Sequence, residues 1–202
     1  MTPATAPKTA TADALLDAVL AACEDDRASH LAGMLAATDR RVLLHGASVA
    51  TLALAMGRRA GLAHAQLPVL ARAALLHDVG KQYVPRVVLD KPGPLVPHER
   101  AVVEAHASVG SFMLLEAGLR EEATIVRHHH ERWDGAGYPD RLFGSAIPYE
   151  SRLIFVADVF DAMTSDRPYR FALSTEVALA EIAAEAGHQL DPGAAGLLPE
   201  IL

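Results

Sequence analysis

Cysteine is almost absent from this chain of 202 residues, in which Cys23 is the only one. A single cysteine excludes an intramolecular disulfide, fits a reducing compartment, and is more typical of a small buried hydrophobe than of a nucleophile. No apolar run approaches the roughly 20 residues that a membrane-spanning helix needs. The N-terminus also lacks the basic-then-apolar pattern of a signal peptide. We therefore expect a soluble, cytoplasmic protein.

Aromatic residues are scarce, at 5% of the chain, and the 18 basic residues are outnumbered by 25 acidic ones. The net charge of −7 argues against a general binder of nucleic-acid polymers or membrane surfaces. It does not exclude an anionic small-molecule substrate, because bound metal ions can reverse the local field. Hydrophobic residues make up 51%, with Ala and Leu dominant, which excludes general disorder and favours helices over sheet.

The order of apolar and polar residues predicts an all-α protein with one main domain. Residues 1–11 are an Ala, Thr and Pro lead-in that we expect to be disordered. Residues 12–38 are predicted to form short N-terminal helices, and residues 39–202 the main domain.

Apolar spacing within that domain predicts a series of helices, at about residues 39–56, 67–76, 97–117, 121–129, 150–165 and 174–186, and one after 192. Asp39 is expected to cap the first of these helices, which Gly57 and Gly61 help to end. The stretches 85–97 and 133–148 are rich in Pro and Gly and are predicted to be largely loop.

Histidine is unusually frequent, with ten in the chain, and five of them can form one site with two aspartates. His77 and Asp78 are adjacent at the end of a predicted helix, and Asp158 stands in an apolar stretch where an unpaired acid is costly to bury. Imidazole with carboxylate suits iron, manganese, zinc or nickel. The candidate ligands are His45, His77, Asp78, His106, His129, His130 and Asp158.

Seven ligands exceed what one ion usually takes, so we predict two ions bridged by a carboxylate. Two metals about 3.5–4 Å apart can share a hydroxide and clamp a phosphoryl group for in-line attack. The ligand set therefore favours phosphate-ester hydrolysis over redox chemistry, although spacing alone does not decide between them.

Each of these residues has a structural alternative when taken alone. A lone histidine is more often a satisfied core or surface residue, and the run 128–130 could be a solvated helix end. His30, His64, His98 and His188 have no such company and are interpreted as structural. Only the combination of positions across several helices favours a metal site.

With these residues assembled, the chain resembles the HD-GYP family, a branch of the HD-domain metal phosphohydrolases. The resemblance covers roughly residues 40 to 200. A bare His-Asp pair is weak, but the order of the following motifs is specific: HDVGK at 77–81, VP at 84–85, LDKPG at 89–93, HE at 98–99, VG at 109–110, HHERWDGAGYP at 129–139, IP at 147–148, ADVFDAMTSDRPYR at 157–170 and GHQLDP at 187–192.

The resemblance implies a compact helical bundle of the HD-domain type, which hydrolyses cyclic di-GMP to pGpG and then GMP. It implies two divalent transition-metal ions, with iron or manganese expected and nickel, zinc or cobalt as alternatives. Asp78 would bridge them. The first metal would be held by His45, His77, Asp78 and Asp158, and the second by Asp78, His106, His129 and His130.

Four further residues receive substrate roles from the resemblance. Lys81 matches the family lysine near the metal centre and would act with Asp78 in catalysis. Arg167 and Arg170 match basic positions that contact the nucleotide, although each could be part of a solvated basic turn. Tyr138 belongs to the loop that gives the family its name, with Gly135, Gly137 and Pro139. This loop is expected to serve substrate access or contacts with a protein partner.

Arg41 departs from the pattern of the family. Members with three metals carry a glutamate at this place, one helical turn before the first ligand histidine. A cation cannot replace a carboxylate ligand, so we predict two metals. A preference for the linear dinucleotide is an alternative for dinuclear members, so full activity on the cyclic one does not follow. Only about 35 residues precede the resemblance, so we expect no receiver module within the chain and regulation by partners or by the N-terminal helices.

Three functions remain open from the sequence. The leading hypothesis is a cyclic di-GMP phosphodiesterase. The second is a phosphohydrolase acting on pGpG, another cyclic dinucleotide or a nucleotide, against which the GYP loop argues. The third is a non-catalytic binder that senses the messenger, against which the retention of all seven candidate ligands argues. No oligomeric state is predicted.

Overall fold

The computed structural model describes residue 19 and residues 25–166 and 171–202, whose regular elements are all helical. The predicted all-α class is therefore confirmed. In this part of the chain no helix is both long and apolar enough to cross a membrane. The elements are α2 (Asp26–Arg59), α3 (Gln66–Leu76), η1 (Val79–Tyr83), α4 (Arg86–Leu89), α5 (Pro97–Glu116), α6 (Arg120–Arg127), η2 (Gly144–Ala146), α7 (Tyr149–Thr164), α8 (Thr175–Glu185), α9 (Pro192–Leu197) and η3 (Leu198–Glu200).

Helix α2 is the longest element, and it is broken once at Asp39, where φ is −154° and ψ is 97°. The Asp39 carboxylate accepts the backbone N–H of Arg41 at 3.0 Å, so it caps the second half of α2 as predicted. The helix ends at Arg59, and Gly61 follows with φ +78° as predicted, whereas Gly57, which was also expected to help end the helix, lies within it. The division of the chain at residue 39 into two segments stays a prediction.

Two helix boundaries differ from the prediction. The stretch 85–97 contains one helical turn, α4, because the Pro85 carbonyl accepts the N–H groups of Val88 and Leu89. Helix α6 ends at Arg127, so His129 and His130 follow it in a turn. The imidazoles of His128 and His129 donate to the carbonyls of Thr124 and Val126, in the last helical turn. These side-chain bonds take the place of backbone N–H groups that would continue the helix.

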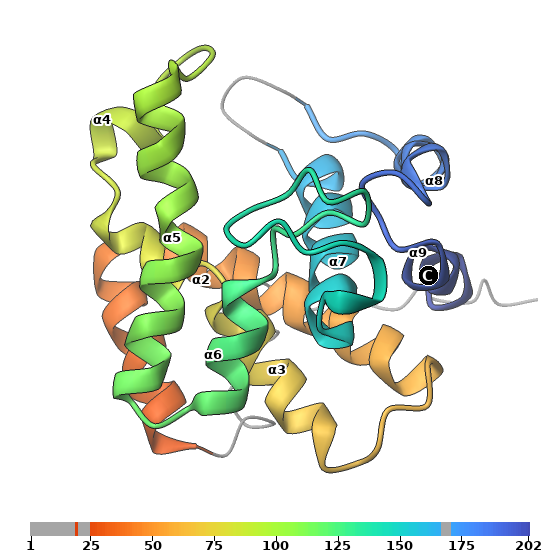
Figure 1. Ribbon diagram of the computed structural model, residues 1–202, viewed down its shortest axis with the longest axis horizontal. Coiled ribbons are helices and arrows are strands. Elements are labelled where there is room, and N and C mark those ends of the chain that lie inside the picture. Colours follow the sequence, from red (N-terminus) through yellow and green to blue (C-terminus); the bar gives the residue numbers. More distant parts are fainter. Residues whose placement is uncertain (1–18, 20–24, 167–170) are drawn as a thin grey trace, which may run out of the picture.

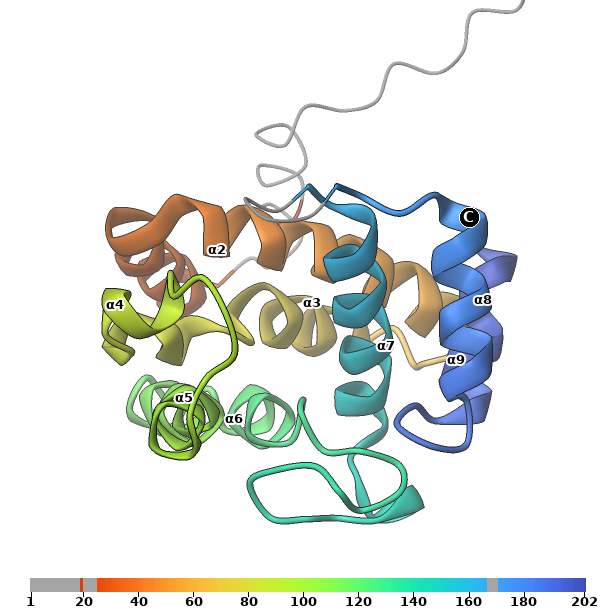
Figure 2. The ribbon, with the colours of Figure 1, turned by 90° about the horizontal axis from the view of Figure 1, so that it is seen from above.

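The helices form layers around one core (Figures 1 and 2). Figure 2 shows α2 along one side of the molecule, α3 beneath it, and α5 and α6 nearly end-on below α3. Helix α7 crosses these layers, and α8 and α9 cover its far side (Figure 1). Buried aliphatic side chains from α2, α3, α6 and α7 fill the centre. Their packing holds these four helices against one another. The largest include Leu35, Met56, Leu70, Leu76, Leu153 and Ile154.

Candidate metal centre

The predicted ligands come from separate elements that meet at one place. His45 is on α2, His77 and Asp78 join α3 to η1, and His106 is on α5. Gly80 permits the close approach of η1 to α5, because a Cβ atom there would lie 2.1 Å from the His106 carbonyl oxygen. The remaining ligand candidates follow α6 (His129 and His130) or lie on α7 (Asp158).

Three buried histidines share one local arrangement. In His77, His106 and His129 the Nδ1 atom lies 2.6–2.7 Å from the backbone carbonyl three residues earlier. A carbonyl only accepts, so each Nδ1 must carry the hydrogen. In the neutral ring the Nε2 atom is then unprotonated, which is the arrangement that a metal-ligating histidine needs.

The Nε2 atoms converge on the carboxylate of Asp78. Oδ1 of Asp78 lies 3.3 Å from Nε2 of His106 and 4.0 Å from Nε2 of His129, and Oδ2 lies 3.4 Å from Nε2 of His77. The Nε2 atoms of His106 and His129 are 3.3 Å apart. When the rings are neutral, the Nε2 lone pairs of these histidines face one another and the carboxylate of Asp78, with no hydrogen bond between them.

This arrangement leaves buried polar atoms without partners. In the described part of the chain, Nε2 of His77 and Oδ1 of Asp78 are buried and accept no hydrogen bond. Unpaired buried acceptors are unfavourable unless another group satisfies them. A divalent cation is the group that a set of imidazole nitrogens and a carboxylate oxygen would satisfy. The residues therefore fit a metal.

In the described residues, two sets of potential ligand atoms lie at this place, and within each set all the atoms are within 4.8 Å of one another. One set is Asp78, His106, His129 and His130. The other is His45, His77 and Asp78. Asp78 is the residue that the two sets share.

Asp158 lies outside both sets. Its Oδ1 atom is 2.9 Å from Nε2 of His45, and Oδ2 of Asp161 is 2.6 Å from Nδ1 of the same ring. Burial lowers the pKa of His45, but the two carboxylates outweigh burial and raise it to about 10. Asp161 had no assigned role in the sequence prediction. Its signal was its place three residues after Asp158 on one helix, which puts both carboxylates on one face.

Charges at the centre follow from burial and neighbours. Burial lowers the pKa of His130 to about 3 and that of His129 well below its ordinary value, so both rings are neutral and able to act as ligands. Burial alone would raise the pKa of Asp78, but the Lys81 ammonium and His77 hold it well below its ordinary value. Asp78 is thus an anion, and His129 and His130 beside it are neutral.

Lys81 lies at the entrance to this cluster. Its Nζ atom donates to Oδ2 of Asp78 at 2.5 Å, and its side chain is 26% exposed. Lys81 also lines a cavity of about 1080 Å³, together with His45, Asp78, His130 and Asp158. A cavity of this size accommodates a nucleotide-sized ligand, so the candidate ligands are accessible to one.

The loop containing Tyr138 packs directly against the metal ligands. The Tyr138 ring lies 4.9 Å from that of His130, centroid to centroid. Buried Glu131 holds the loop by accepting the N–H groups of Asp140 at 2.6 Å and Leu142 at 3.0 Å. Gly137 is required here, because a Cβ atom would lie 2.3 Å from the backbone nitrogen of Arg132. The sequence prediction did not single out Glu131. Its role in the loop is visible only from its burial and its two hydrogen bonds.

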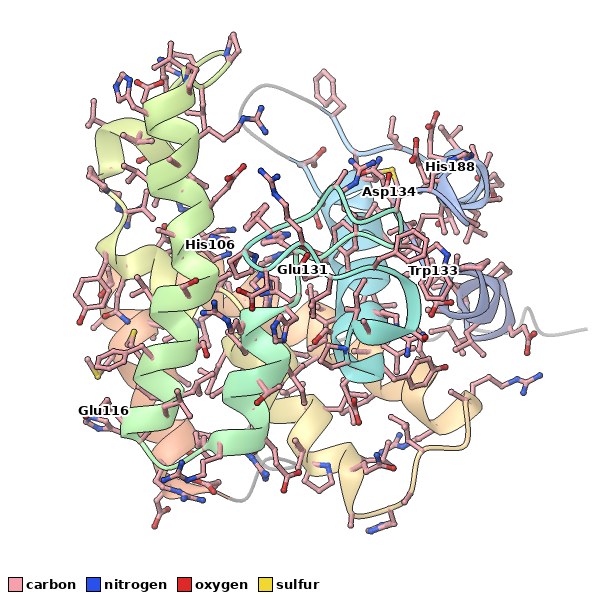
Figure 3. All side chains as sticks on the ribbon, in the orientation of Figure 1. His106, Glu116, Glu131, Trp133, Asp134 and His188 are labelled. Carbon is pink, nitrogen blue, oxygen red and sulfur yellow. The ribbon has the colours of Figure 1, made fainter. Side chains whose placement is uncertain are left out.

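Figure 3 shows how this loop is placed between α5 and the C-terminal helices. His106 lies on the side of α5 that faces the loop carrying Glu131 (Figure 3). On the other side, the N–H groups of Trp133 and Asp134 donate to the carbonyls of Gln189 and His188, both at 2.9 Å. The loop is therefore held within itself by Glu131 and bonded at residues 133 and 134 to the segment before α9.

Four histidines interpreted as structural lie on the surface and outside both sets of ligand atoms: His30, His64, His98 and His188. His128 is also outside them and pairs with Asp140 at 2.9 Å. Arg167 and Arg170, to which the resemblance gave nucleotide contacts, lie outside the described residues.

Together the helical bundle and the histidine–aspartate cluster define a domain with a set of residues that fits a metal ion beside an open cavity. The chain belongs to the HD domain family, whose model matches residues 28–193. The motifs quoted above place it in the HD-GYP branch, as predicted.

Curated relatives agree with this placement. The chain is 44% identical over 135 residues to the cyclic di-GMP phosphodiesterase response regulator RpfG of Xanthomonas campestris, an alignment covering 65% of this chain and 36% of that protein. It is 35% identical over 174 residues to the 3'3'-cGAMP-specific phosphodiesterase 2 of Vibrio cholerae, covering 85% and 33%. The chain thus spans about a third of the length of these relatives.

Solved structures share the fold. Bd1817, described as an HDG"Y"P protein of Bdellovibrio bacteriovorus, superposes with a TM-score of 0.67 at 21% identity, covering 94% of this chain and 61% of that one. The HD domain of the phosphodiesterase PgpH of L. monocytogenes superposes with a TM-score of 0.60 at 18% identity, covering 85% and 94%. These likenesses confirm the predicted HD-type helical bundle.

Proposed function

We propose that this chain is a metal-dependent phosphodiesterase domain that hydrolyses cyclic di-GMP to pGpG or GMP. One observation carries the proposal: the Nε2 atoms of His106 and His129 converge on Oδ1 of Asp78, at 3.3 and 4.0 Å, while backbone carbonyls hold the Nδ1 atoms of both rings. The names of the curated relatives support a cyclic dinucleotide as substrate.

Two divalent cations, with iron or manganese expected, are the proposed cofactors. His45, His77 and Asp78 would hold one, with Asp158 in reach of His45 as a further ligand. Asp78, His106, His129 and His130 would hold the other. When bound, such a pair lowers the pKa of water and withdraws charge from phosphoryl oxygens.

The chain's own residues supply binding and orientation. Three backbone carbonyls orient the imidazole rings of His77, His106 and His129. Lys81 contributes positive charge beside Asp78, where the transition state of phosphodiester hydrolysis becomes more anionic. Tyr138 packs on His130 but lines a second pocket, on the side of the loop, and would contact the substrate from there. Arg167 and Arg170 would contact the nucleotide.

Turnover by the metal-loaded protein tests this proposal. The protein is purified without oxygen and loaded with iron or manganese, and its products are followed by chromatography. The substrates are cyclic di-GMP, pGpG and 3'3'-cGAMP, the last because one relative is named for it. Cleavage of cyclic di-GMP is expected. No turnover of any of the three, with metal confirmed bound, would refute a catalytic role and leave a non-catalytic binder.

Metal analysis and one variant test the dinuclear centre separately. A stoichiometry near two is expected, whereas a value near three would show that the interpretation of Arg41 is wrong. Asp78→Ala should abolish activity and lower the occupancy of both metals, because Asp78 belongs to both sets of ligand atoms. Surviving activity would exclude Asp78 as the bridge.

A further inference from the structure

The wall of the cavity also carries an arginine that is not among the candidate metal ligands. Arg41 and His45 both line the cavity, and they lie four residues apart on α2, which places them on one face of the helix. The Arg41 side chain is 67% exposed. A cation on the same helix face as a ligand histidine is available to whatever occupies the cavity.

One edge of the Arg41 guanidinium is held in place. Its Nε atom donates to Oδ1 of Asp39 at 3.1 Å and its Nη2 atom to Oδ2 at 3.0 Å. This two-bond pairing orients the planar group. In the described part of the chain no hydrogen bond uses the Nη1 atom. The second partner, Asp90, is 56% exposed and 3.6 Å away, a loose contact that an anion can displace.

Arg86 has a different task in the same group of charges. Its Nη1 atom donates to Asp39 at 2.5 Å and its Nη2 atom to the Thr38 carbonyl at 2.8 Å. Both donors are therefore directed at the kink of α2, and Arg86 ties α4 to it. Arg86 positions Asp39, and Asp39 positions Arg41.

We propose that Arg41 binds the phosphate that is not being cleaved in a substrate with two phosphodiester groups. The inference rests on the proposed function, since it assumes that the reacting phosphate lies at the histidine cluster. A guanidinium with one edge fixed and the other open to the cavity is matched to a phosphate oxygen pair. Arg41 is then a specificity-determining residue, which favours dinucleotides over phosphodiesters with a single phosphate.

Binding measurements on a small set of variants test this assignment. Wild type, Arg41→Gln, Arg41→Lys and Arg40→Gln are titrated calorimetrically with cyclic di-GMP and with bis(p-nitrophenyl) phosphate, which has one phosphate. Arg40→Gln is the matched control, because Arg40 is exposed on the same helical turn and does not line the cavity. Metal content and thermal unfolding are recorded for each protein.

Arg41→Gln is expected to weaken cyclic di-GMP binding about tenfold, the value of a charge-assisted hydrogen bond. Binding of bis(p-nitrophenyl) phosphate and metal content should stay unchanged. Arg41→Lys should recover part of the loss, because it keeps the charge but not the paired donors. The wild-type affinity for cyclic di-GMP should also decrease more steeply with salt than that of Arg41→Gln.

Three results would overturn the assignment: unchanged affinity of Arg41→Gln for cyclic di-GMP, an equal loss with the single-phosphate probe, or an equal loss in Arg40→Gln. Failure of wild type to bind cyclic di-GMP would overturn it as well. Wild type that binds cyclic di-GMP through Arg41 without cleaving it would refute the proposed function alone, so the two hypotheses fail separately.

Discussion

Oδ2 of Asp161 lies 2.6 Å from Nδ1 of His45, and this contact determines which way the imidazole faces. The two residues are 116 positions apart in the chain. In His77, His106 and His129 a backbone carbonyl accepts from Nδ1 and thereby directs Nε2 toward the centre. For His45 the carboxylate of Asp161 is this acceptor. Because the acceptor is a side chain here, it can be removed by mutation.

Asp161→Asn is expected to weaken metal binding at the His45 position by about 10- to 100-fold, since the amide can donate to Nδ1 and favour the wrong tautomer. Chelator competition measures the affinity, and circular dichroism checks the fold. Asp26→Asn, an exposed position in the first turn of α2, is the control. Equal affinities of Asp161→Asn and wild type would show that Asp161 does not orient His45.

Gly80→Ala should disturb the centre through the backbone. The added Cβ atom would lie 2.1 Å from the His106 carbonyl oxygen, which forces η1 and α5 apart and moves Asp78 away from His106. We expect a loss of about 1–3 kcal/mol in the free energy of unfolding, together with reduced metal content.

Gly33→Ala is the matched control for Gly80→Ala. Gly33 is exposed within α2, and beyond its chain neighbours and the backbone of α2 no atom lies within 4 Å of the place that a Cβ atom would take. Alanine there should stabilise the protein by about 0.5–1 kcal/mol. Urea unfolding measures both variants. A Gly80→Ala protein as stable as wild type would contradict the close approach of the two helices.

Glu131→Ala should loosen the loop that packs on His130. It leaves the N–H groups of Asp140 and Leu142 without their acceptor, which costs about 1–3 kcal/mol for each donor that stays buried. Hydrogen exchange across residues 132–144 should accelerate, and activity should decrease. Glu116→Ala, exposed at the end of α5 (Figure 3), should change stability by less than about 0.5 kcal/mol. Unchanged exchange in Glu131→Ala would exclude this role.

Acid should remove the contribution of Asp140 to stability. Its hydrogen bond with Arg127, and then that with His128, lowers the pKa of Asp140 to about 2. A depressed carboxyl pKa stabilises the folded state above the unfolded value of about 3.9, and this contribution is lost as pH falls toward 2. The pair is about one third exposed, so we expect about 0.2–1 kcal/mol.

The test compares wild type with Asp140→Asn by urea unfolding of metal-free protein between pH 5 and pH 2. The difference in unfolding free energy should be largest near pH 5 and should have lost most of its size at pH 2. A difference that is as large at pH 2 as at pH 5 would mean that the asparagine acts through packing rather than through the lost charge.

Local sequence patterns were sufficient for most of the helices. Asp39 as a cap and Gly61 at a helix end are short-range features, because the groups that they satisfy are within a few residues. The boundaries missed, at α4 and after Arg127, depend on local bonds to the carbonyls of Pro85, Thr124 and Val126. Apolar periodicity does not specify which donor takes each of these carbonyls.

The residues alone were enough to predict the kind of site, from the ligand types and their order along the chain, and to indicate the family. They did not show which of these residues contact one another. The folded structure was needed to place Asp158 and Asp161 on either side of His45, 113 and 116 positions away, and Arg41 on the wall of the same cavity. These contacts join helices that meet only when the core between them is buried, so no periodicity within one helix can reveal them.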